Sequence, residues 1–288
     1  MPEDWLRELD ALLSSGQPEA AERFLLDRLT VLEEQGESES AFFLSLLNEL
    51  ASLYRGISRY QESEQAFVRL QKTLQAKGQT HTLPYAVVLI NIAGCYRLTG
   101  DALRALEHYG AAQAVLASLT DSTNISPEEQ QRARYLTASV LNNISLLYCD
   151  TGQFELALSH AERAAKLIRA GVGDEHELAT TYNNLASIYL KLGRMAEAEE
   201  ACGNALALYQ RMPRENVHHA AALATFAALR FEQGDYPAAE AALQEALVLT
   251  EHFFGRNAEY AVAERNLAQV REALAQTRRT AQDQKNGG

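Results

Sequence analysis

Cysteine, proline and long apolar runs are all scarce in this chain. Its 288 residues include three cysteines and no CxxC motif, so neither a disulfide framework nor a zinc site is expected. Six prolines leave room for long helices. No apolar run approaches the roughly 18 residues that a membrane-spanning helix needs. The N-terminus, MPEDWLRELD, is acidic and amphipathic, unlike a signal peptide. We therefore expect a cytoplasmic, helical protein.

Basic charge is also scarce. The net charge of −12 opposes binding to nucleic acid and to anionic membranes, so neither is an expected partner. The histidines are scattered, and no nucleophile–base pair or carboxylate cluster stands out. We expect no enzymatic activity, no metal and no cofactor. Apolar residues, at 47%, are ample for a core.

A helix–turn–helix pattern recurs along nearly the whole chain and is clearest in Thr180–Ala205. Apolar residues at i, i+3, i+4 and i+7 from Tyr182 form one stripe of a helix. Gly193 can take the left-handed conformation that ends it, and small residues such as Ala198 line a second helix. The same turn returns with a period of about 42 residues. Its positions are Gly16, Ser58, Gly100, Gly152, Gly193 and Gly234.

Large residues on the first helix and small ones on the second, around a glycine turn, resemble the tetratricopeptide repeat family. The TNNLA-like run within Thr180–Ala205 and the long loops between repeats are similar to the repeats of kinesin light chains. The resemblance implies an all-α solenoid of about six helix pairs with a C-terminal capping helix, wound into a right-handed superhelix. It also implies a scaffold that binds proteins or peptides.

A single solenoid is expected over residues 1–279, with a disordered tail at 280–288. Pro18 and Pro237 suit the first turns of the second helices of repeats one and six. Cys95 and Cys202 fall at core positions. The repeats are predicted at about 2–35, 40–79, 84–120, 127–171, 178–212 and 218–254, and the capping helix at 257–277.

The interval between the third and fourth turns is longer, and the excess lies in Thr120–Gln130. Ser126 begins a capping box, so a helix is predicted from Pro127 to about Asp150. It would overhang its repeat by about 16 Å. Three interpretations of Thr120–Tyr135 stay open: a lip over a groove, a dimer contact, or a surface insertion without a function. A homo-oligomer is thus also left open.

Asparagine recurs on the face that the resemblance places inside the solenoid. It fills most of the positions nine and ten residues before each turn, although it disfavours a helix interior by roughly 0.6 kcal/mol against alanine. Its carboxamide both donates and accepts, so a ladder of them could hold the backbone of an extended peptide. The alternative is that these side chains bond to neighbouring repeats or to water. They are Asn48, Asn91, Asn142, Asn143, Asn183 and Asn184.

Five further residues are candidates for the same face: Arg55, Arg97, Thr180, Ser187 and Lys191. Arg55 and Arg97 precede the turn in adjacent repeats, so they could align and select a ligand carboxylate. Solvated helix ends are the alternative. Repeats that bind chaperone tails pair such asparagines with lysines, and no lysine stands at the corresponding positions here, so chaperone-tail binding is not expected.

Three functions remain after these exclusions. The leading one is an adaptor whose concave groove holds a peptide segment of a partner protein. The second is a regulator that senses a small peptide, but without a DNA-binding domain, because residues 1–35 are strongly acidic. The third is a structural subunit that assembles a complex through its convex face or its overhang.

Overall fold

The computed structural model describes residues 4–172, 174–212 and 217–286. Residues 2 and 3 of the first predicted repeat and 287–288 of the predicted tail lie outside this range. The described residues form thirteen α-helices, one short π-helical segment and no strand, which confirms the all-α prediction. The helices are α1 (Asp4–Ser14), α2 (Pro18–Glu34), α3 (Ala41–Gly56), α4 (Tyr60–Ala76), α5 (Leu83–Leu98), α6 (Ala102–Thr120), α7 (Pro127–Asp150), α8 (Phe154–Leu167), η1 (Ile168–Val172), α9 (Glu175–Lys191), α10 (Met195–Tyr209), α11 (Val217–Glu232), α12 (Tyr236–Phe254) and α13 (Ala258–Asn286).

All six predicted turns adopt the left-handed conformation. Their φ angles lie between 64° at Ser58 and 83° at Gly100. In each turn the next residue donates its N–H to the carbonyl at the end of the first helix, as Arg194 does to Tyr189 O at 2.9 Å. Among the described residues Ser58 is the one non-glycine with positive φ. The turn therefore requires a residue with positive φ, and glycine supplies it at every one of these positions except Ser58.

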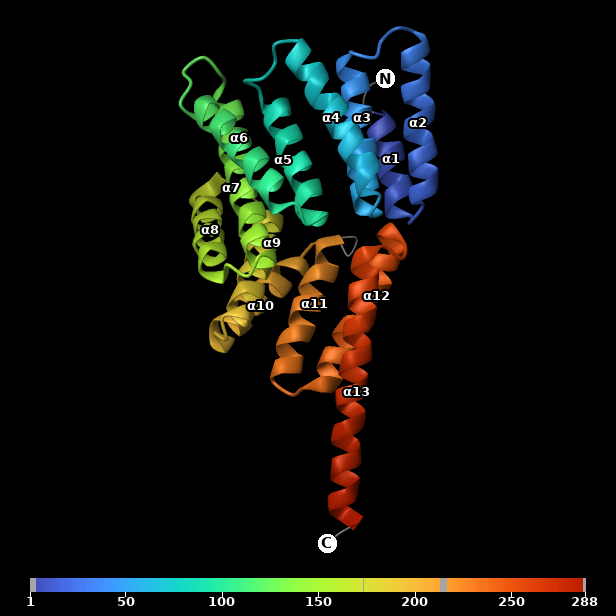
Figure 1. Cartoon of the computed structure of the whole chain (residues 1–288), viewed down its shortest axis with the longest axis vertical. Coiled ribbons are helices and arrows are strands. Elements are labelled where there is room, and N and C mark those ends of the chain that lie inside the picture. The colour runs from blue at the N-terminus through green and yellow to red at the C-terminus, as the bar shows by residue number, and fades with distance from the viewer. Residues whose placement is uncertain (1–3, 173, 213–216, 287–288) are drawn as a thin grey trace.

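The helix pairs stack in two layers. First helices α3, α5, α7, α9 and α11 contact one another in sequence, and each second helix packs between its own first helix and the next one (Figure 1). Small residues permit this close packing, because Ala105, Ala157 and Ala198 at the start of the second helices are fully buried. Cys95 and Cys202 are buried in the core, as predicted. We call the surface of the first helices that faces away from the second helices the inner face.

The predicted overhang of α7 is present. Glu129 N–H donates to Ser126 Oγ at 3.2 Å and Ser126 N–H to Glu129 Oε2 at 3.3 Å, which confirms the capping box. Ala133 is fully buried, and Gln131 Nε2 donates to Gly171 O at 2.8 Å. The overhang thus packs against the segment that leads into the next repeat.

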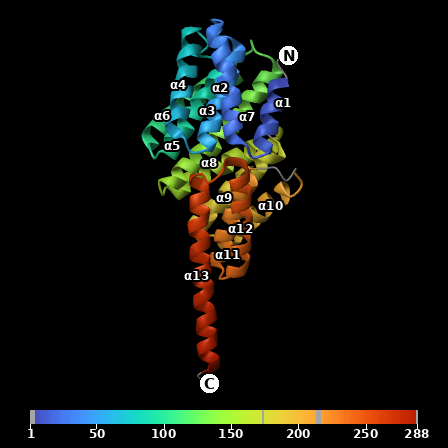
Figure 2. The same ribbon diagram turned by 90° about the vertical axis from the view of Figure 1, so that its right-hand side faces the viewer.

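The last repeat returns to the first two. Asn257 Nδ2 donates to Gly56 O at 3.0 Å, and Ala258 N–H donates to Ser58 Oγ at 3.1 Å. Figures 1 and 2 show the turn between α12 and α13 beside the lower ends of the N-terminal helices. This end-to-end contact gives a reason for the serine in a glycine position: its hydroxyl helps to cap α13.

Two glycines bring the ends close together. A Cβ on Gly16 would lie 2.3 Å from His252 O, and one on Gly56 would lie 2.7 Å from a ring carbon of Phe254. Any larger side chain would push the last repeat away. His252 Nε2 also lies 3.0 Å from Ser14 O.

Helix α13 continues beyond the predicted end of the capping helix. The sequence pattern predicts a helix to 277 and a disordered tail from 280, whereas α13 extends to Asn286. The reason is local, since the added residues are mostly Arg, Ala, Gln and Lys, which favour helix even without tertiary contacts. Among the described helices, none is both long and apolar enough to cross a membrane.

Candidate functional site

At the junction of α3 with α5, an arginine is held by an asparagine. Arg55 Nη1 donates to Asn91 Oδ1 at 3.0 Å, and its guanidinium lies 5.9 Å from the Phe67 ring centroid. No carboxylate of the described residues pairs with Arg55, so most of its donors stay available. Asn48 Nδ2 instead donates to its neighbour Glu49 at 3.1 Å.

Arg97 does not align with Arg55 as a pair. Its Nη1 donates to Asp150 Oδ2, at the end of α7, at 2.7 Å. Its Nε is buried and has no hydrogen-bond partner. Arg55 and Arg97 occupy equivalent positions in adjacent repeats, yet each bonds to a different type of residue on the next first helix.

The junction of α7 with α9 is a buried polar network. Asn142 is 4% exposed, and its Nδ2 donates to the fully buried Thr181 Oγ1 at 2.7 Å. Thr181 Oγ1 donates to Glu177 O at 2.8 Å, and Tyr135 OH to Glu177 Oε2 at 3.1 Å. Desolvation is the largest cause that raises the pKa of the Glu177 carboxyl. Asn142 thus joins two repeats through its Nδ2, while its buried Oδ1 has no partner.

Two neighbouring asparagines of α9 keep unpaired polar atoms. Asn183 Oδ1 and Asn184 Nδ2 are both buried and have no partner. Asn143 of α7 is different, because its Nδ2 turns back to Ser139 O at 3.0 Å. An acceptor and a donor are therefore left unpaired on α9.

The remaining three candidates of α9 differ in their surroundings. Thr180 Oγ1 lies 3.0 Å from Tyr209 OH and 3.1 Å from His176 O, so it is already engaged. Ser187 is half-buried and Lys191 is exposed. Of these three, Ser187 and Lys191 have accessible polar groups that form no side-chain hydrogen bond or ion pair with the described residues.

A histidine pair that the sequence analysis did not select lies near Arg55. His218, at the start of α11, contacts the ring of His176 with a centroid distance of 4.8 Å. Desolvation, followed by the charges of His176 and Arg55, lowers the pKa of His218 to about 4. His218 keeps exposed surface, and Arg55 of repeat two is close enough for its charge to act on the ring. His176 lies in the first turn of α9.

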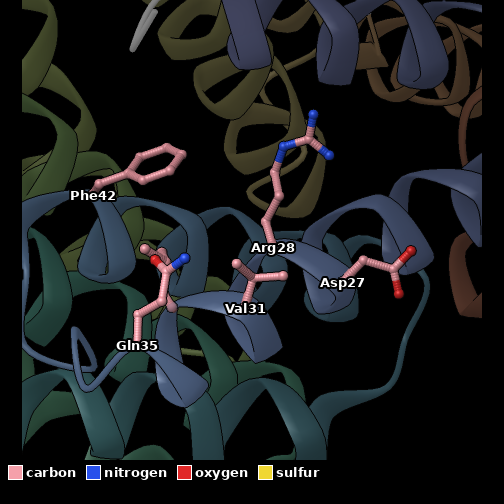
Figure 3. A pocket seen from close by; sticks show the side chains of 6 residues that line it. Asp27, Arg28, Val31, Gln35 and Phe42 are labelled. Atoms are coloured by element: carbon pink, nitrogen blue, oxygen red, sulfur yellow. The ribbon is translucent and has the colours of Figure 1, made fainter.

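A shallow hollow of about 440 Å³ lies elsewhere, against α2 (Figure 3). Phe42 flanks it from α3, and Val31 is 49% exposed beside it. None of its lining residues is a candidate from the sequence. These residues are Asp27, Arg28, Val31, Leu32, Gln35 and Phe42. Within the described residues, no group of three or more His, Cys, Asp or Glu side chains could hold a metal ion.

The sequence profile of the tetratricopeptide repeat matches residues 136–211 and 177–247. Kinesin light chain-related protein 2 of Arabidopsis thaliana is 32% identical over 111 residues, which are 38% of this chain and 15% of that protein. Kinesin light chain-related protein 1 is 25% identical over 164 residues, 56% of this chain and 25% of that protein. The chain thus spans a quarter or less of the length of these relatives.

Solved structures share the fold. BtubC (BKLC) of P. vanneervenii has a TM-score of 0.51 at 21% identity, over 77% of this chain and 84% of that chain. A putative kinesin light chain with nearly identical repeats, from Podosopora anserina, has a TM-score of 0.51 at 19% identity, over 74% of this chain and 99% of that one. A Rap protein complexed with Competence and Sporulation Factor has a TM-score of 0.63 at 15% identity, over 94% and 75%. The chain therefore carries tetratricopeptide repeats in an all-α solenoid, and kinesin light chain-related proteins are its sequence relatives.

Proposed function

We propose that this protein is an adaptor whose inner face binds an extended peptide segment of a partner protein. The observation that carries the proposal is the pair of unpaired amide atoms on α9, Asn183 Oδ1 and Asn184 Nδ2. A buried polar atom without a partner costs about 1–3 kcal/mol. A peptide backbone supplies both a donor and an acceptor, so it can recover that cost.

Arg55 and Asn91 extend this surface toward the first repeats. Asn91 orients the guanidinium but does not neutralise it. A peptide that runs along the inner face from α9 toward α3 would first contact the amides of Asn183 and Asn184 and then the guanidinium of Arg55. Such a surface suits a peptide backbone followed by an acidic group.

The relatives support binding rather than catalysis. Tetratricopeptide and kinesin light chain-like folds are generally non-enzymatic scaffolds, and we propose no reaction for this chain. We place its action in the cytoplasm, where its three unpaired thiols would stay reduced.

A peptide sensor is the second candidate. The Rap protein with a similar fold was solved in complex with Competence and Sporulation Factor, and the alignment covers 94% of this chain. A sensor would bind a free small peptide, whereas an adaptor would bind a segment within a larger protein.

Affinity selection tests the proposal. The purified chain is incubated with a pool of random octapeptides, and the bound peptides are identified by mass spectrometry. We expect a defined set to bind the parent and to be lost in Asn183→Ala. Asn204→Ala, at an exposed site on α10, is the matched control and should retain them. Failure of the parent to retain any set, or equal loss in both variants, would contradict binding at the inner face.

A second step separates the two candidates. The selected sequence is offered as a free peptide and as an internal segment of a carrier protein. Equal affinity for both forms supports the adaptor. Binding of the free peptide alone supports the sensor.

A further inference from the structure

The end-to-end contact is small enough to open. Within the described residues, three hydrogen bonds join the last repeat and α13 to the first two repeats. The bond that ends on Ser14 and the bond from Ala258 are exposed. An exposed hydrogen bond is exchanged for one with water at little net cost. The ends can therefore part while the repeats on either side stay folded.

The contact is nevertheless specific, because one side chain both starts the last helix and holds it in place. Asn257 Oδ1 accepts the N–H of Tyr260 in the first turn of α13 at 2.9 Å. Asn257 Nδ2 donates to Gly56 O in repeat two. The asparagine itself is 7% exposed. The first turn of α13 is thus fixed to the end of α3.

Repeats two and six also approach each other across the inner face. Desolvation first, and then the charges of His176 and Arg55, lower the pKa of His218. His218 begins in the first turn of α11, the first helix of repeat six, whereas Arg55 lies in the last turn of α3, the first helix of repeat two. The solenoid is therefore wound tightly enough to bring these two helices near each other.

The atoms that the proposed function requires are buried in this closed conformation. Asn183 Oδ1 and Asn184 Nδ2 are shielded from solvent and have no hydrogen-bond partner. The whole of Asn184 is only 5% exposed. A peptide cannot bond to an atom that water does not reach. The inner face must therefore open before these amides can hold a ligand.

The curvature of the solenoid connects these two observations. Each repeat is rotated slightly against the next, and the sum of these rotations sets the curvature. Closing the last repeat onto the first two requires tight curvature, which presses the inner edges of successive first helices together. When the ends part, the curvature can relax, and the inner edges of α7, α9 and α11 can separate.

We propose that the end-to-end contact keeps the inner face closed, and that a peptide binds there only after this contact opens. The inference rests on the proposed peptide-binding function and adds its regulation. The free chain exchanges between a closed and an open form, and the open form alone exposes Asn183 and Asn184. Because the contact and the peptide exclude each other, each weakens the other by the same factor.

A matched pair of glycine variants opens the contact selectively. Gly16→Ala places a Cβ against His252 O, closer than any real contact, so the ends must separate. Gly152→Ala is the control, because it has a similar positive φ, 75° against 68°, and no atom within 4 Å of the added Cβ. Both variants carry the strain of alanine at a positive φ, so they differ in the contact. Circular dichroism confirms that both remain helical.

The reactivity of a thiol reports opening without any ligand. Ser187→Cys, in a Cys149→Ala background, places the thiol on the inner face of α9, one turn after Asn183, while the other two cysteines are buried. We expect iodoacetamide to alkylate it about threefold faster or more with Gly16→Ala, and at the parent rate with Gly152→Ala. Equal rates in the two glycine variants would overturn the proposal.

The same two glycine variants are then tested with an octapeptide that the parent selects. The apparent affinity falls with the fraction of chains that are open, so Gly16→Ala should strengthen binding up to about tenfold if roughly a tenth of the parent is open. Gly152→Ala should bind as the parent does. Faster alkylation with unchanged affinity would contradict the link between opening and binding. If the parent selects no peptide, the proposed function fails, while the alkylation rates still decide whether the ends close the inner face.

A reversible cross-link tests the closed form directly. Gln17→Cys and Arg256→Cys, at exposed sites on the two sides of the contact, are joined by a cleavable bismaleimide in the Cys149→Ala background. The joined chain should bind the selected octapeptide about tenfold more weakly or worse, and cleavage of the linker should restore the affinity. The same variant treated with a monofunctional maleimide is the control. Undiminished binding while the ends are joined would overturn the proposal.

Discussion

At the junction of α3 with α5, Asn91 accepts a hydrogen bond from Arg55, whereas at the junction of α7 with α9 Asn142 donates one to Thr181. Asn91 is half-buried and leaves the guanidinium most of its donors. Asn142 is 4% exposed, and its partner is fully buried. The same residue type on the same face thus orients a cation in one place and joins two helices in the other.

The difference lies in the surroundings of each amide. A half-buried asparagine can exchange its partner with water or a ligand at low cost. The bond from Asn142 Nδ2 to Thr181 is buried, so breaking it leaves both groups without water and costs their full desolvation. Stability should therefore depend on the Asn142–Thr181 bond between α7 and α9, whereas ligand binding should depend on Asn91 and Arg55 and on the unpaired amides of Asn183 and Asn184.

The largest expected effect comes from breaking the buried network. Thr181→Val keeps the shape of the side chain but removes the acceptor for Asn142, and should lower the free energy of unfolding by about 1–3 kcal/mol. Urea denaturation measures it. Thr225→Val on α11 is the control, since Thr225 Oγ1 bonds only to Ala221 O in its own helix. Similar losses in both variants would show that the junction has no special role.

The Glu177 carboxyl of the same network should make the free energy of unfolding depend on pH. Burial raises the pKa of Glu177 from 4.5, so the folded chain binds more protons just above that value, and stability falls as the pH rises through this window. Glu177→Gln should remove the fall, so the variant gains stability at neutral pH relative to the parent and not below pH 4.5. Parallel urea titrations from pH 4 to 8 test this. A constant difference across that range would contradict it.

A smaller and opposite dependence is expected beside Arg55. The pKa of His218 is lowered from 6.5 to about 4, so the unfolded chain binds more protons between these values. Stability is then lost as the pH falls through that window. His218→Gln should lose less than the parent, while His81→Gln, in the exposed loop before α5, should follow the parent. Equal pH profiles for the parent and His218→Gln would contradict the placement of this ring.

The smallest effect on stability is expected at the end-to-end contact. Ser58→Gly relieves a positive φ but removes the acceptor of Ala258 N–H, so the two changes should nearly cancel, to within about 1 kcal/mol. The distance between the ends should nevertheless lengthen. Electron-spin measurements between labels at the exposed Gln17 and Arg256, in a Cys149→Ala background, detect it.

Ser58→Asn is the control for the contact. Asparagine tolerates a positive φ and keeps an acceptor, so its distance distribution should stay close to that of the parent. An unchanged distance in Ser58→Gly would show that the serine hydroxyl does not hold the ends together. If the contact does loosen, binding at Arg55 should change while the Asn142 network keeps its stability.

Structural features that depend on local backbone geometry could be predicted from the sequence. The turn residues, the capping box at Ser126 and the helix Pro127–Asp150 follow from backbone rules that act within a few residues. Repetition of the turn then predicted the stacked helices. Helix α13 extended beyond its predicted end because the Arg, Ala, Gln and Lys residues there have a high helix propensity.

Contacts between repeats could not be predicted from local sequence patterns. The return of Asn257 to Gly56 depends on the sum of many small rotations between repeats, which no local pattern encodes. The depth of Asn142 depends on how closely α7 and α9 approach. Gly94 did carry a signal, since a glycine inside a helix, where other repeats hold larger residues, marks a close approach: a Cβ there would lie 3.2 Å from Arg55 Nη1.

The most direct test of the difference between the two junctions measures stability and binding together in Asn91→Ala and Asn142→Ala. Asn91→Ala should weaken a selected peptide about fivefold to tenfold and change the free energy of unfolding by less than about 1 kcal/mol. Asn142→Ala should lower the free energy of unfolding by about 1–3 kcal/mol and leave the affinity of the folded protein unchanged. Equal or reversed effects in the two variants would contradict the assignment of binding to Asn91 and of stability to Asn142.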